Sequence, residues 1–483
     1  MERPTPISHF IPVLLACGLL LVLSGCGKSV EPAREEILAA FPEAPDSSGL
    51  TRELANAFAG AYKQIETGEN PVAGLARLTR IYQANGYLND AIKGEDLLLR
   101  LDPENPLWPH LLAFNLAGYG QLEPAIELWE KVMELAPDYL PAHLRRAEAL
   151  LKLNRLDDAR DAYLVVLIKD PDNAHANHGL ARIEIDHGDY ESALPYLQKS
   201  MATSKGTIGI QLMVTVLDRI GQSEKADSIR AMARTLEGHT DIIDPWFDSL
   251  IDYCYDPYQL VTAAGTKVFA GDVEGGIAIM NRALSYDPDY ASAYHQLGII
   301  YRDAGRPQEA LPNFARAAEL NPKLPDAWLF QALIYLDRGM TEEGEKLLTL
   351  GLAHNPASPS LHRVWGEQLM KKGRIDDAEK EFKRSIELRP QEPEPYLALA
   401  RIYMDQDKLE EAREKVLESL NAEAGNPMGL TMMVVLNINL GDEEKALEWL
   451  RRVDLQPRIT DDVRGQLVGF FERAFGHKPP RNP

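Results

Sequence analysis

A pattern of residues that recurs every 34 positions constrains the fold of this chain more than any other feature. It is clearest in the segment that starts at Ala291, where it comprises Tyr294, Leu297, Gly298, Tyr301, Gly305, Ala310, Phe314, Ala317 and Pro322. The small residues let two helices approach closely, and the aromatic residues fill the space between them. The glycine ends a first helix and the proline stops a second. The pattern therefore predicts pairs of antiparallel helices.

The same pattern begins again about eleven times. The segments start near Val72, Pro106, Leu140, Ala174 and Thr207, and then near Pro257, Ala291, Pro325, Pro359, Pro393 and Pro427. The turn between the two helices falls on glycine except at Asn154 and Asp407. This pattern resembles the tetratricopeptide repeat across roughly residues 72–460. The resemblance implies an all-α superhelical solenoid of antiparallel helix pairs, arranged in two arrays.

Some positions depart from the pattern. Gly276, Gly344 and Gly351 stand where alanine is usual, so we expect looser packing there. The frame divides the chain into a signal peptide, a tether, two arrays separated by an insert, and a final helix with its tail. The boundaries are 1–25, 26–48, 49–240, 241–256, 257–460 and 461–483. Within these parts, residues 50–65 and 461–475 predict helices that cap the two ends.

The insert between the arrays reads DIIDPWFDSLIDYCYD and holds four aromatic residues. One interpretation is a linker that plugs the end of the first array and starts the second. The other is an element that docks a partner. Cys254 within the insert has no neighbouring base or metal motif, so we expect a small packed side chain and not a reactive thiol.

The first residues predict a targeting segment that is not part of the fold. Residues 10–23 are apolar and too short for a comfortable membrane span, but long enough for a signal-peptide core. They end in Leu23-Ser24-Gly25-Cys26, which resembles the bacterial lipobox. The resemblance implies cleavage before Cys26, lipidation of its thiol and attachment to the cell envelope, the alternative being an uncleaved anchor. Because Gly27 and not aspartate follows, it favours the outer membrane, facing the periplasm.

Composition and motifs restrict the function. A formal net charge of -22 argues against binding to nucleic acid. No phosphate loop, dinucleotide fingerprint, C-x-x-C or nucleophile elbow occurs, so we expect no enzyme and no cofactor. His175, His178 and His187 with Asp186 are the best metal candidates. His187 lies too far along the helix to be a convincing third ligand, so we expect no metal site.

The resemblance also implies a ligand groove, which the second, fifth, ninth and twelfth residues of each first helix line. On the first array these include His110, Phe114, Leu144, Glu148, His175, His178 and Arg182. On the second they include Tyr258, His295, Arg302, Leu329, Leu333, Arg363, Met370, Arg401, Met404 and Met428. Arginine and methionine suit an extended or helical peptide. We therefore expect a scaffold or adaptor that binds envelope proteins. The alternatives are a lipoprotein that binds a peptide, glycan or small ligand, and an accessory subunit of an envelope enzyme.

Overall fold

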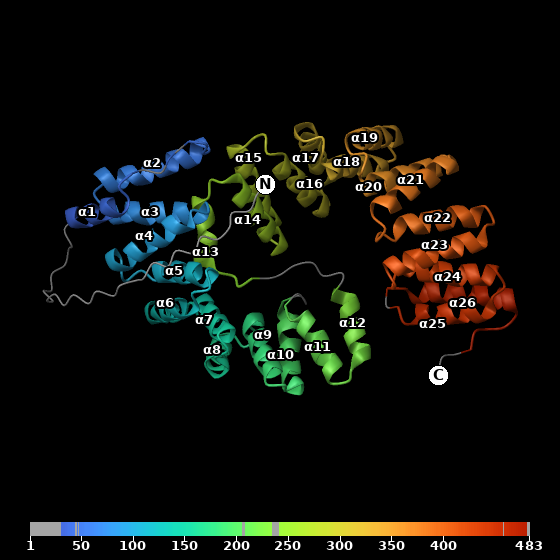
Figure 1. Cartoon of the computed structure of the whole chain (residues 1–483), viewed down its shortest axis with the longest axis horizontal. Coiled ribbons are helices and arrows are strands. Elements are labelled where there is room, and N and C mark those ends of the chain that lie inside the picture. The colour runs from blue at the N-terminus through green and yellow to red at the C-terminus, as the bar shows by residue number, and fades with distance from the viewer. Residues whose placement is uncertain are drawn as a thin grey trace.

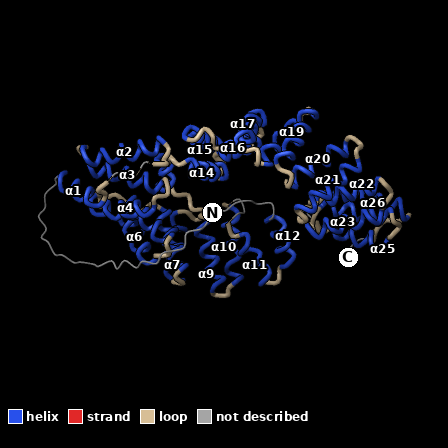
Figure 2. The backbone as a smooth tube through the Cα atoms, turned by 45° about the horizontal axis from the view of Figure 1, so that its top comes forward, coloured by secondary structure: helices blue, strands red, loops and turns tan. Residues whose placement is uncertain are grey.

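The computed structural model describes residues 30–43, 46, 48–204, 208–233, 241–456 and 458–480. Over these ranges the chain is all-α, with helices and connecting loops but no strand (Figure 2). The predicted fold class is confirmed: five helix pairs form a first array and six form a second, each pair made of a first and a second helix.

The first array begins with two helices that precede the repeats, α1 (Val30–Ala40) and α2 (Arg52–Thr67). The five pairs that follow are α3 (Pro71–Ala84) with α4 (Leu88–Leu101), α5 (Leu107–Gly118) with α6 (Leu122–Leu135), α7 (Leu140–Lys152) with α8 (Leu156–Lys169), α9 (Ala174–Asp186) with α10 (Tyr190–Thr203), and α11 (Ile210–Arg219) with α12 (Ser223–Ala233). The insert then forms α13 (Pro245–Asp248) and one 3₁₀ turn, η1 (Ser249–Tyr253).

The second array has six pairs and a closing helix. The pairs are α14 (Pro257–Phe269) with α15 (Val273–Tyr286), α16 (Ala291–Asp303) with α17 (Pro307–Leu320), α18 (Pro325–Asp337) with α19 (Thr341–His354), α20 (Pro359–Lys371) with α21 (Ile375–Leu388), α22 (Glu394–Asp405) with α23 (Leu409–Ala422), and α24 (Pro427–Asn439) with α25 (Glu443–Asp454). Helix α26 (Asp461–Phe475) follows the last pair and buries Leu467 and Phe471 in the same core.

The turns within the pairs have the geometry that the sequence predicts. Every turn glycine has a positive φ, and Asn154 and Asp407 reach φ 60° and 61° in the same place. Asparagine and aspartate tolerate this left-handed conformation better than other residues with a Cβ atom.

A recurrent hydrogen bond links successive pairs. Near the start of a first helix, a polar ring donates to the carbonyl of the proline that closes the preceding pair. The donors are His143 to Pro137 (2.9 Å), Trp328 to Pro322 (3.0 Å), His362 to Pro356 (3.0 Å) and Tyr396 to Pro390 (3.2 Å). The carbonyl only accepts, so the histidine Nε2 atoms carry the proton in these bonds. The bond explains why His, Trp and Tyr share one repeat position.

The glycines that replace alanines do not loosen the packing. A Cβ added at Gly344 would lie 2.6 Å from the side chain of Leu336, and one at Gly351 would lie 2.8 Å from Cβ of Trp328. At Gly276 the side chain of Val268 would be 2.3 Å away. The expectation of looser packing is therefore wrong, because large neighbours fill the space that the missing methyl groups leave.

The residues between the predicted lipidation site and the first repeat form more than a tether. Within the segment predicted as residues 26–48, α1 buries Ile37, and Phe41 follows it into the same core. Arg34 donates to the carbonyls of Ile65 (3.1 Å) and Gly68 (2.6 Å). Helices α1 and α2 together therefore close the first end of the solenoid, and α2 is the capping helix predicted at 50–65.

The two arrays are not joined end to end. Helix α13 lies beside α5, and α14 and α15 lie beside α2 and α3, at the opposite end of the first array from α12 (Figure 1). Ala84 at the end of α3 packs against the core formed by Cys254, Leu260 and Ala283. The second array thus continues from the first helix pair, while α5–α12 extend away as a separate arm.

Candidate functional site

The insert, residues 241–256, lies along the groove of the first array. Its first turn is specified locally, since Asp244 caps α13 by accepting from the backbone N–H of Phe247 (3.2 Å), and Pro245 occupies the first helical turn. From there the insert contacts α7, α5 and α3 in that order, crossing three first helices. It occupies the wall that the repeat pattern assigns to a ligand.

A buried carboxylate anchors the insert at its start. Asp244 is 3% exposed and accepts from Nε2 of the fully buried His110 (2.7 Å) and from the Tyr139 hydroxyl. Burial alone would raise the pKa of Asp244, but the bonds from His110 and Tyr139 lower it below its ordinary value. The tyrosine oxygen in turn accepts from the backbone N–H of Trp246 (3.0 Å). Asp244 and Tyr139 thus form the centre of a hydrogen-bond network between the array and the insert.

Aromatic contacts continue the attachment. Trp246 stacks on Tyr139 with ring centroids 3.5 Å apart and planes 9° from parallel. Phe247 lies against Phe114, with centroids 4.4 Å apart. The Arg145 guanidinium covers the Phe114 ring at 5.2 Å and pairs with Asp241 at 3.0 Å. Such ring pairs contribute about 0.5–1.5 kcal/mol each beyond the area they bury.

The end of the insert ties the two arrays together. The Asn85 amide donates to the carbonyl of Tyr253 (2.9 Å) and accepts from the backbone N–H groups of Tyr255 (2.7 Å) and Asp256 (2.9 Å). From the second array, Arg282 donates to the carbonyls of Ile251 and Cys254. One side chain from each array therefore holds the same stretch of backbone.

The structure corrects the predicted place of the insert. It does not plug the far end of the first array near α12, because its side chains pack on α3, α5 and α7. Two of the predicted groove residues, His110 and Phe114, contact the insert through Asp244 and Phe247. Leu144 is buried at 3% exposure, and Glu148 lies beside Arg145 at 3.6 Å. This part of the groove is filled by the chain itself.

The rest of the first-array wall continues on α9. His175 and His178 are half-buried, and Arg182 is exposed. His187, at the end of the helix, contacts Arg160 through Nδ1 at 3.3 Å. Over the described part of the chain, no group of three or more His, Cys, Asp or Glu side chains could hold a metal ion.

The predicted groove of the second array has three arginines, one each on the first helices α16, α20 and α22. Arg302 lies 4.1 Å above the Phe330 ring and pairs with Asp303 at 2.7 Å, and Arg363 pairs with Glu367 at 2.6 Å. Arg401 is exposed, and no ion pair within the described ranges involves it. Two of the guanidinium groups thus already have a carboxylate partner, and the third is open to one.

The other predicted wall residues of the second array divide by exposure. Tyr258 and Met428 are 65% and 60% exposed, whereas Leu329 is buried in the core at 5%. Leu333, Met370 and Met404 are partly buried at the edges of core clusters. His295 is half-buried beside the rings of Phe314 and Phe330, and burial lowers its pKa. The wall is therefore mainly apolar, with guanidinium groups spaced along it.

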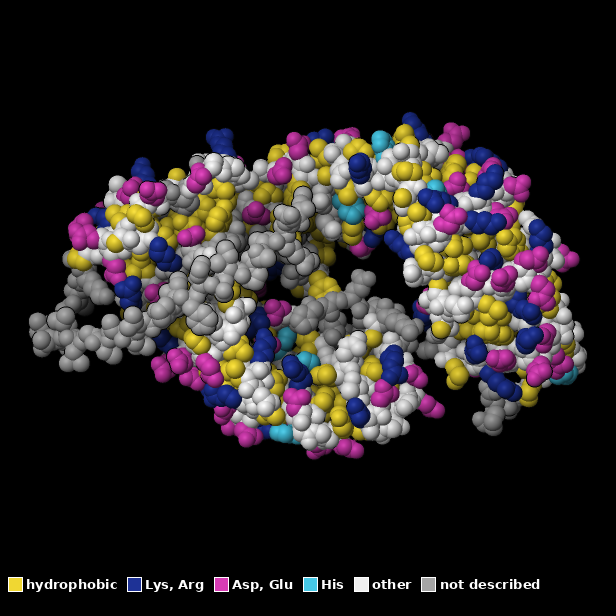
Figure 3. Space-filling view, in the orientation of Figure 1, with side chains coloured by type: hydrophobic (Ala, Val, Ile, Leu, Met, Phe, Trp, Pro, Cys, Tyr) yellow, Lys and Arg dark blue, Asp and Glu magenta, His cyan; other side chains and the backbone are white. Residues whose placement is uncertain are grey.

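Figure 3 shows where these walls face. A deep opening separates the arm that contains α9–α12 from the helices of the second array, and basic, acidic and apolar side chains gather on its rim. In Figure 1 the first helices α14 and α16 lie nearer this opening than the second helices α15 and α17. The second-array groove is therefore on the inner side of the molecule.

The predicted lipid anchor concerns a part of the chain that the structure does not describe. Cys26, the predicted lipidation site, and the signal peptide lie outside the described residues. Among the helices that are described, none combines the length and the apolar character needed to cross a membrane.

Sequence reasoning missed the residues that hold the insert. Asp244, Tyr139 and Asn85 carry no catalytic or ligand motif, and their partners lie 105–171 positions away. One signal was present: Asp-Pro-Trp-Phe within an insert that breaks the repeat frame indicates a capped helical turn with aromatic anchors.

Comparison with known proteins identifies the repeats. A tetratricopeptide repeat model matches residues 116–183, 301–364 and 369–428, and a second one matches 279–311. The chain therefore contains tetratricopeptide repeats, a class whose members bind other proteins.

Individual relatives are distant. The chain is 27% identical to the human protein O-mannosyl-transferase TMTC3 over 35% of its own length and 17% of that protein. It is 24% identical to the TPR repeat-containing protein YpiA of Bacillus subtilis, over 55% of this chain and 58% of that one. These matches span less than two thirds of either relative. The solved structure of yeast Tom70 aligns with 83% of this chain and 95% of its own, at 17% identity and a TM-score of 0.38.

Proposed function

We propose that this protein is a lipid-anchored scaffold of the bacterial cell envelope that binds a segment of a partner protein in the groove of its second array. The observation that supports the proposal most strongly is the insert itself. It demonstrates, within one chain, how a wall of first helices binds a short polypeptide through a carboxylate, aromatic anchors and backbone hydrogen bonds.

The second array has the same kind of wall without a segment of the described chain seated in it. Arg401 has no ion-pair partner among the described residues, and Leu333, Met370 and Met404 offer adaptable apolar surface. A partner segment that carries carboxylates between apolar side chains fits this arrangement. The first-array groove is not the proposed site, because displacing the insert would cost the contacts that hold the two arrays together.

The anchor rests on the lipobox-like Leu23-Ser24-Gly25-Cys26. Acyl chains on Cys26 would hold the scaffold at the membrane more firmly than one chain could. Replacement Cys26→Ser should move the protein from the membrane fraction to the soluble fraction after disruption of the source bacteria. Retention of Cys26→Ser in the membrane fraction, resistant to salt, would contradict the lipid anchor.

The groove is tested by crosslinking in intact cells. We expect a discrete partner to be captured by the native protein and lost when Arg302, Arg363 and Arg401 are all changed to glutamate. The matched control changes Arg316, Arg384 and Arg413 to glutamate, because these lie on the second helices α17, α21 and α23 and also pair with nearby carboxylates. Both variants must keep the native melting temperature within a few degrees. Equal capture by both variants would refute the groove assignment.

A further inference from the structure

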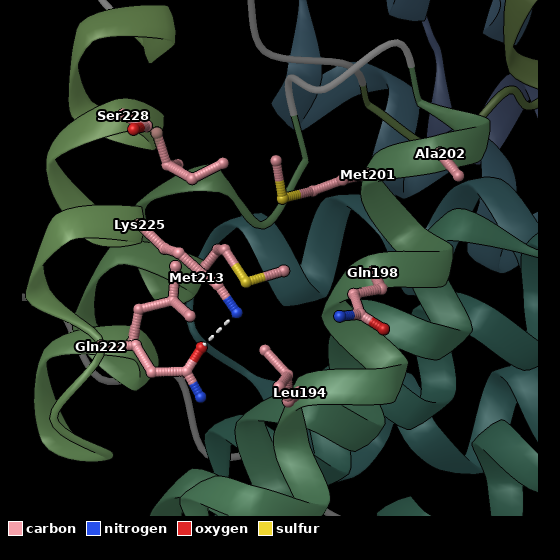
Figure 4. A pocket seen from close by; sticks show the side chains of 10 residues that line it. Leu194, Gln198, Met201, Ala202, Met213, Gln222, Lys225 and Ser228 are labelled. Atoms are coloured by element: carbon pink, nitrogen blue, oxygen red, sulfur yellow. Dashed lines mark hydrogen bonds between the residues drawn. The ribbon is translucent and has the colours of Figure 1, made fainter.

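A second hollow lies away from both grooves, on the last two helix pairs of the arm. It is an open cleft of about 630 Å³ between the second helices α10 and α12 (Figure 4). Met213 and Leu217 of α11 form its floor, and Leu194, Met201 and Ile229 form its walls. Such a volume lies within the range of about 300–1,000 Å³ that is usual for sites of small ligands.

Apolar side chains face each other across this step of the solenoid, whereas two other steps carry a polar link at the same positions. In the step from α21 to α22, the Tyr403 hydroxyl reaches Glu379 at 3.0 Å. In the step from α8 to α9, Arg160 pairs with Glu184 at 2.5 Å. The equivalent residues between α10 and α11 are Leu217 and Leu194. These leucines make no polar bond, so this side of the cleft is aliphatic.

One charged group points into this apolar space. The Lys225 ammonium lies within the cleft and donates to Oε1 of Gln222 at 2.8 Å, as Figure 4 shows. An ammonium has three donors, and no carboxylate belongs to the residues that line the cleft. Within the described chain no ion pair involves Lys225. The lining therefore offers a positive charge above an aliphatic floor.

We propose that this cleft binds a single aliphatic chain that ends in a carboxylate. The tail would lie on Met213 and Leu217, with the flexible side chain of Met201 closing around it. The carboxylate would accept hydrogen bonds from the Lys225 ammonium, with the amides of Gln198 and Gln222 beside it. This site is independent of the groove proposed for a partner protein, and either can fail without the other.

The test uses purified protein and saturated carboxylates of increasing length, followed by calorimetry. Affinity should rise about fourfold per added methylene, which corresponds to about 0.8 kcal/mol of burial, until the cleft is full. Replacement Ala202→Trp fills the cleft from an exposed position of its wall, so it should abolish binding without altering the melting temperature. Lys225→Gln should lower the affinity for the carboxylate about two- to fivefold and leave the affinity for an alcohol of equal chain length unchanged.

The control is Lys199→Gln, an exposed lysine of α10 that does not line the cleft, and it should bind like the native protein. Absence of binding, affinity that is independent of chain length, or binding that survives Ala202→Trp would each overturn the proposal. Selective binding of an acidic amphipathic peptide at this cleft, with no carboxylate bound, would show that the occupant is a protein segment instead.

Discussion

Replacement of Asp244 by alanine should release the insert from the first array. Asp244 is buried and accepts from His110, from Tyr139 and from the backbone of α13. His110 is fully buried, and its Nδ1 atom already has no partner within the described residues, so truncation would leave both ring nitrogens unsatisfied. A lost bond to a charged group costs about 1.5–3 kcal/mol. Breaking such a buried pair costs about 3–5 kcal/mol, which we expect here.

Hydrogen exchange measured by mass spectrometry is the suitable assay, because the insert can open locally while the helix pairs stay folded. A loss of 3–5 kcal/mol corresponds to about two to three and a half orders of magnitude in the opening equilibrium. Peptides that cover residues 244–256 should therefore exchange faster by that factor. Peptides from α20–α23, which do not contact the insert, should keep their native rates.

Two variants make the result specific. Asp252→Ala changes an exposed carboxylate of the same insert and should leave the exchange rates unchanged. Asp244→Asn keeps one acceptor oxygen and should fall between the native protein and Asp244→Ala. If Asp244→Ala exchanges like Asp252→Ala, the buried carboxylate does not hold the insert in the groove and the reasoning fails.

Three further results are expected. Burial raises the pKa of Glu95 from 4.5 to about 8, so the unfolded state loses its proton first and the unfolding free energy falls by about 5 kcal/mol between pH 4.5 and 8. Urea titrations at pH 5 and 8 should show this fall in the native protein and not in Glu95→Gln. An equal fall in both proteins would contradict the raised pKa. Asn154→Gly and Asp407→Gly remove the strain of a Cβ atom at positive φ, so each should raise the unfolding free energy by up to about 1 kcal/mol. A lower unfolding free energy would show that the native side chains make stabilising contacts that outweigh this strain. Gly351→Ala should lower the unfolding free energy by about 1–3 kcal/mol, because the new methyl group would clash with Trp328. An unchanged unfolding free energy would show that Trp328 shifts to accommodate the methyl group.

The repeat pattern predicted the local structure well because each of its residues acts through near neighbours. Gly305 and Asn154 specify turns within a few residues of themselves, and Phe314 and Ala317 pack within adjacent helices. Interactions of this range depend on the period of the sequence. Helix positions, turn residues and the closing helix could therefore be read without the structure.

The path of the chain between the arrays could not be predicted in the same way. It depends on Asn85, Asp244 and Arg282, each of which bonds to a partner outside its own helix pair at a separation that follows no repeat. Glu95 shows the same limit at one site. It stands where Trp129 and Tyr163 stand in the next two repeats, and only the structure shows that Asn115 bonds to its buried carboxyl group.

The consequence for the candidate site is also physical. Repeat position predicts which side chains face the groove, but it carries no information on what fills the groove. His110 and Phe114 occupy ligand-facing positions and are covered by the chain itself, while Arg401 is exposed. Equivalent positions in one solenoid can thus serve internal structure in one array and remain open in the other.

The most direct test of this account places a photo-crosslinking residue at one groove position of each array, Phe114 and Met404, in cells that make the protein. On illumination, position 114 should crosslink to residues 241–256 of the same chain, and position 404 should crosslink to a different protein of the envelope. Mass spectrometry of the joined peptides distinguishes the two products. Joining of position 114 to other proteins, with no product to the insert, would contradict the central claim that the first-array groove is filled from within.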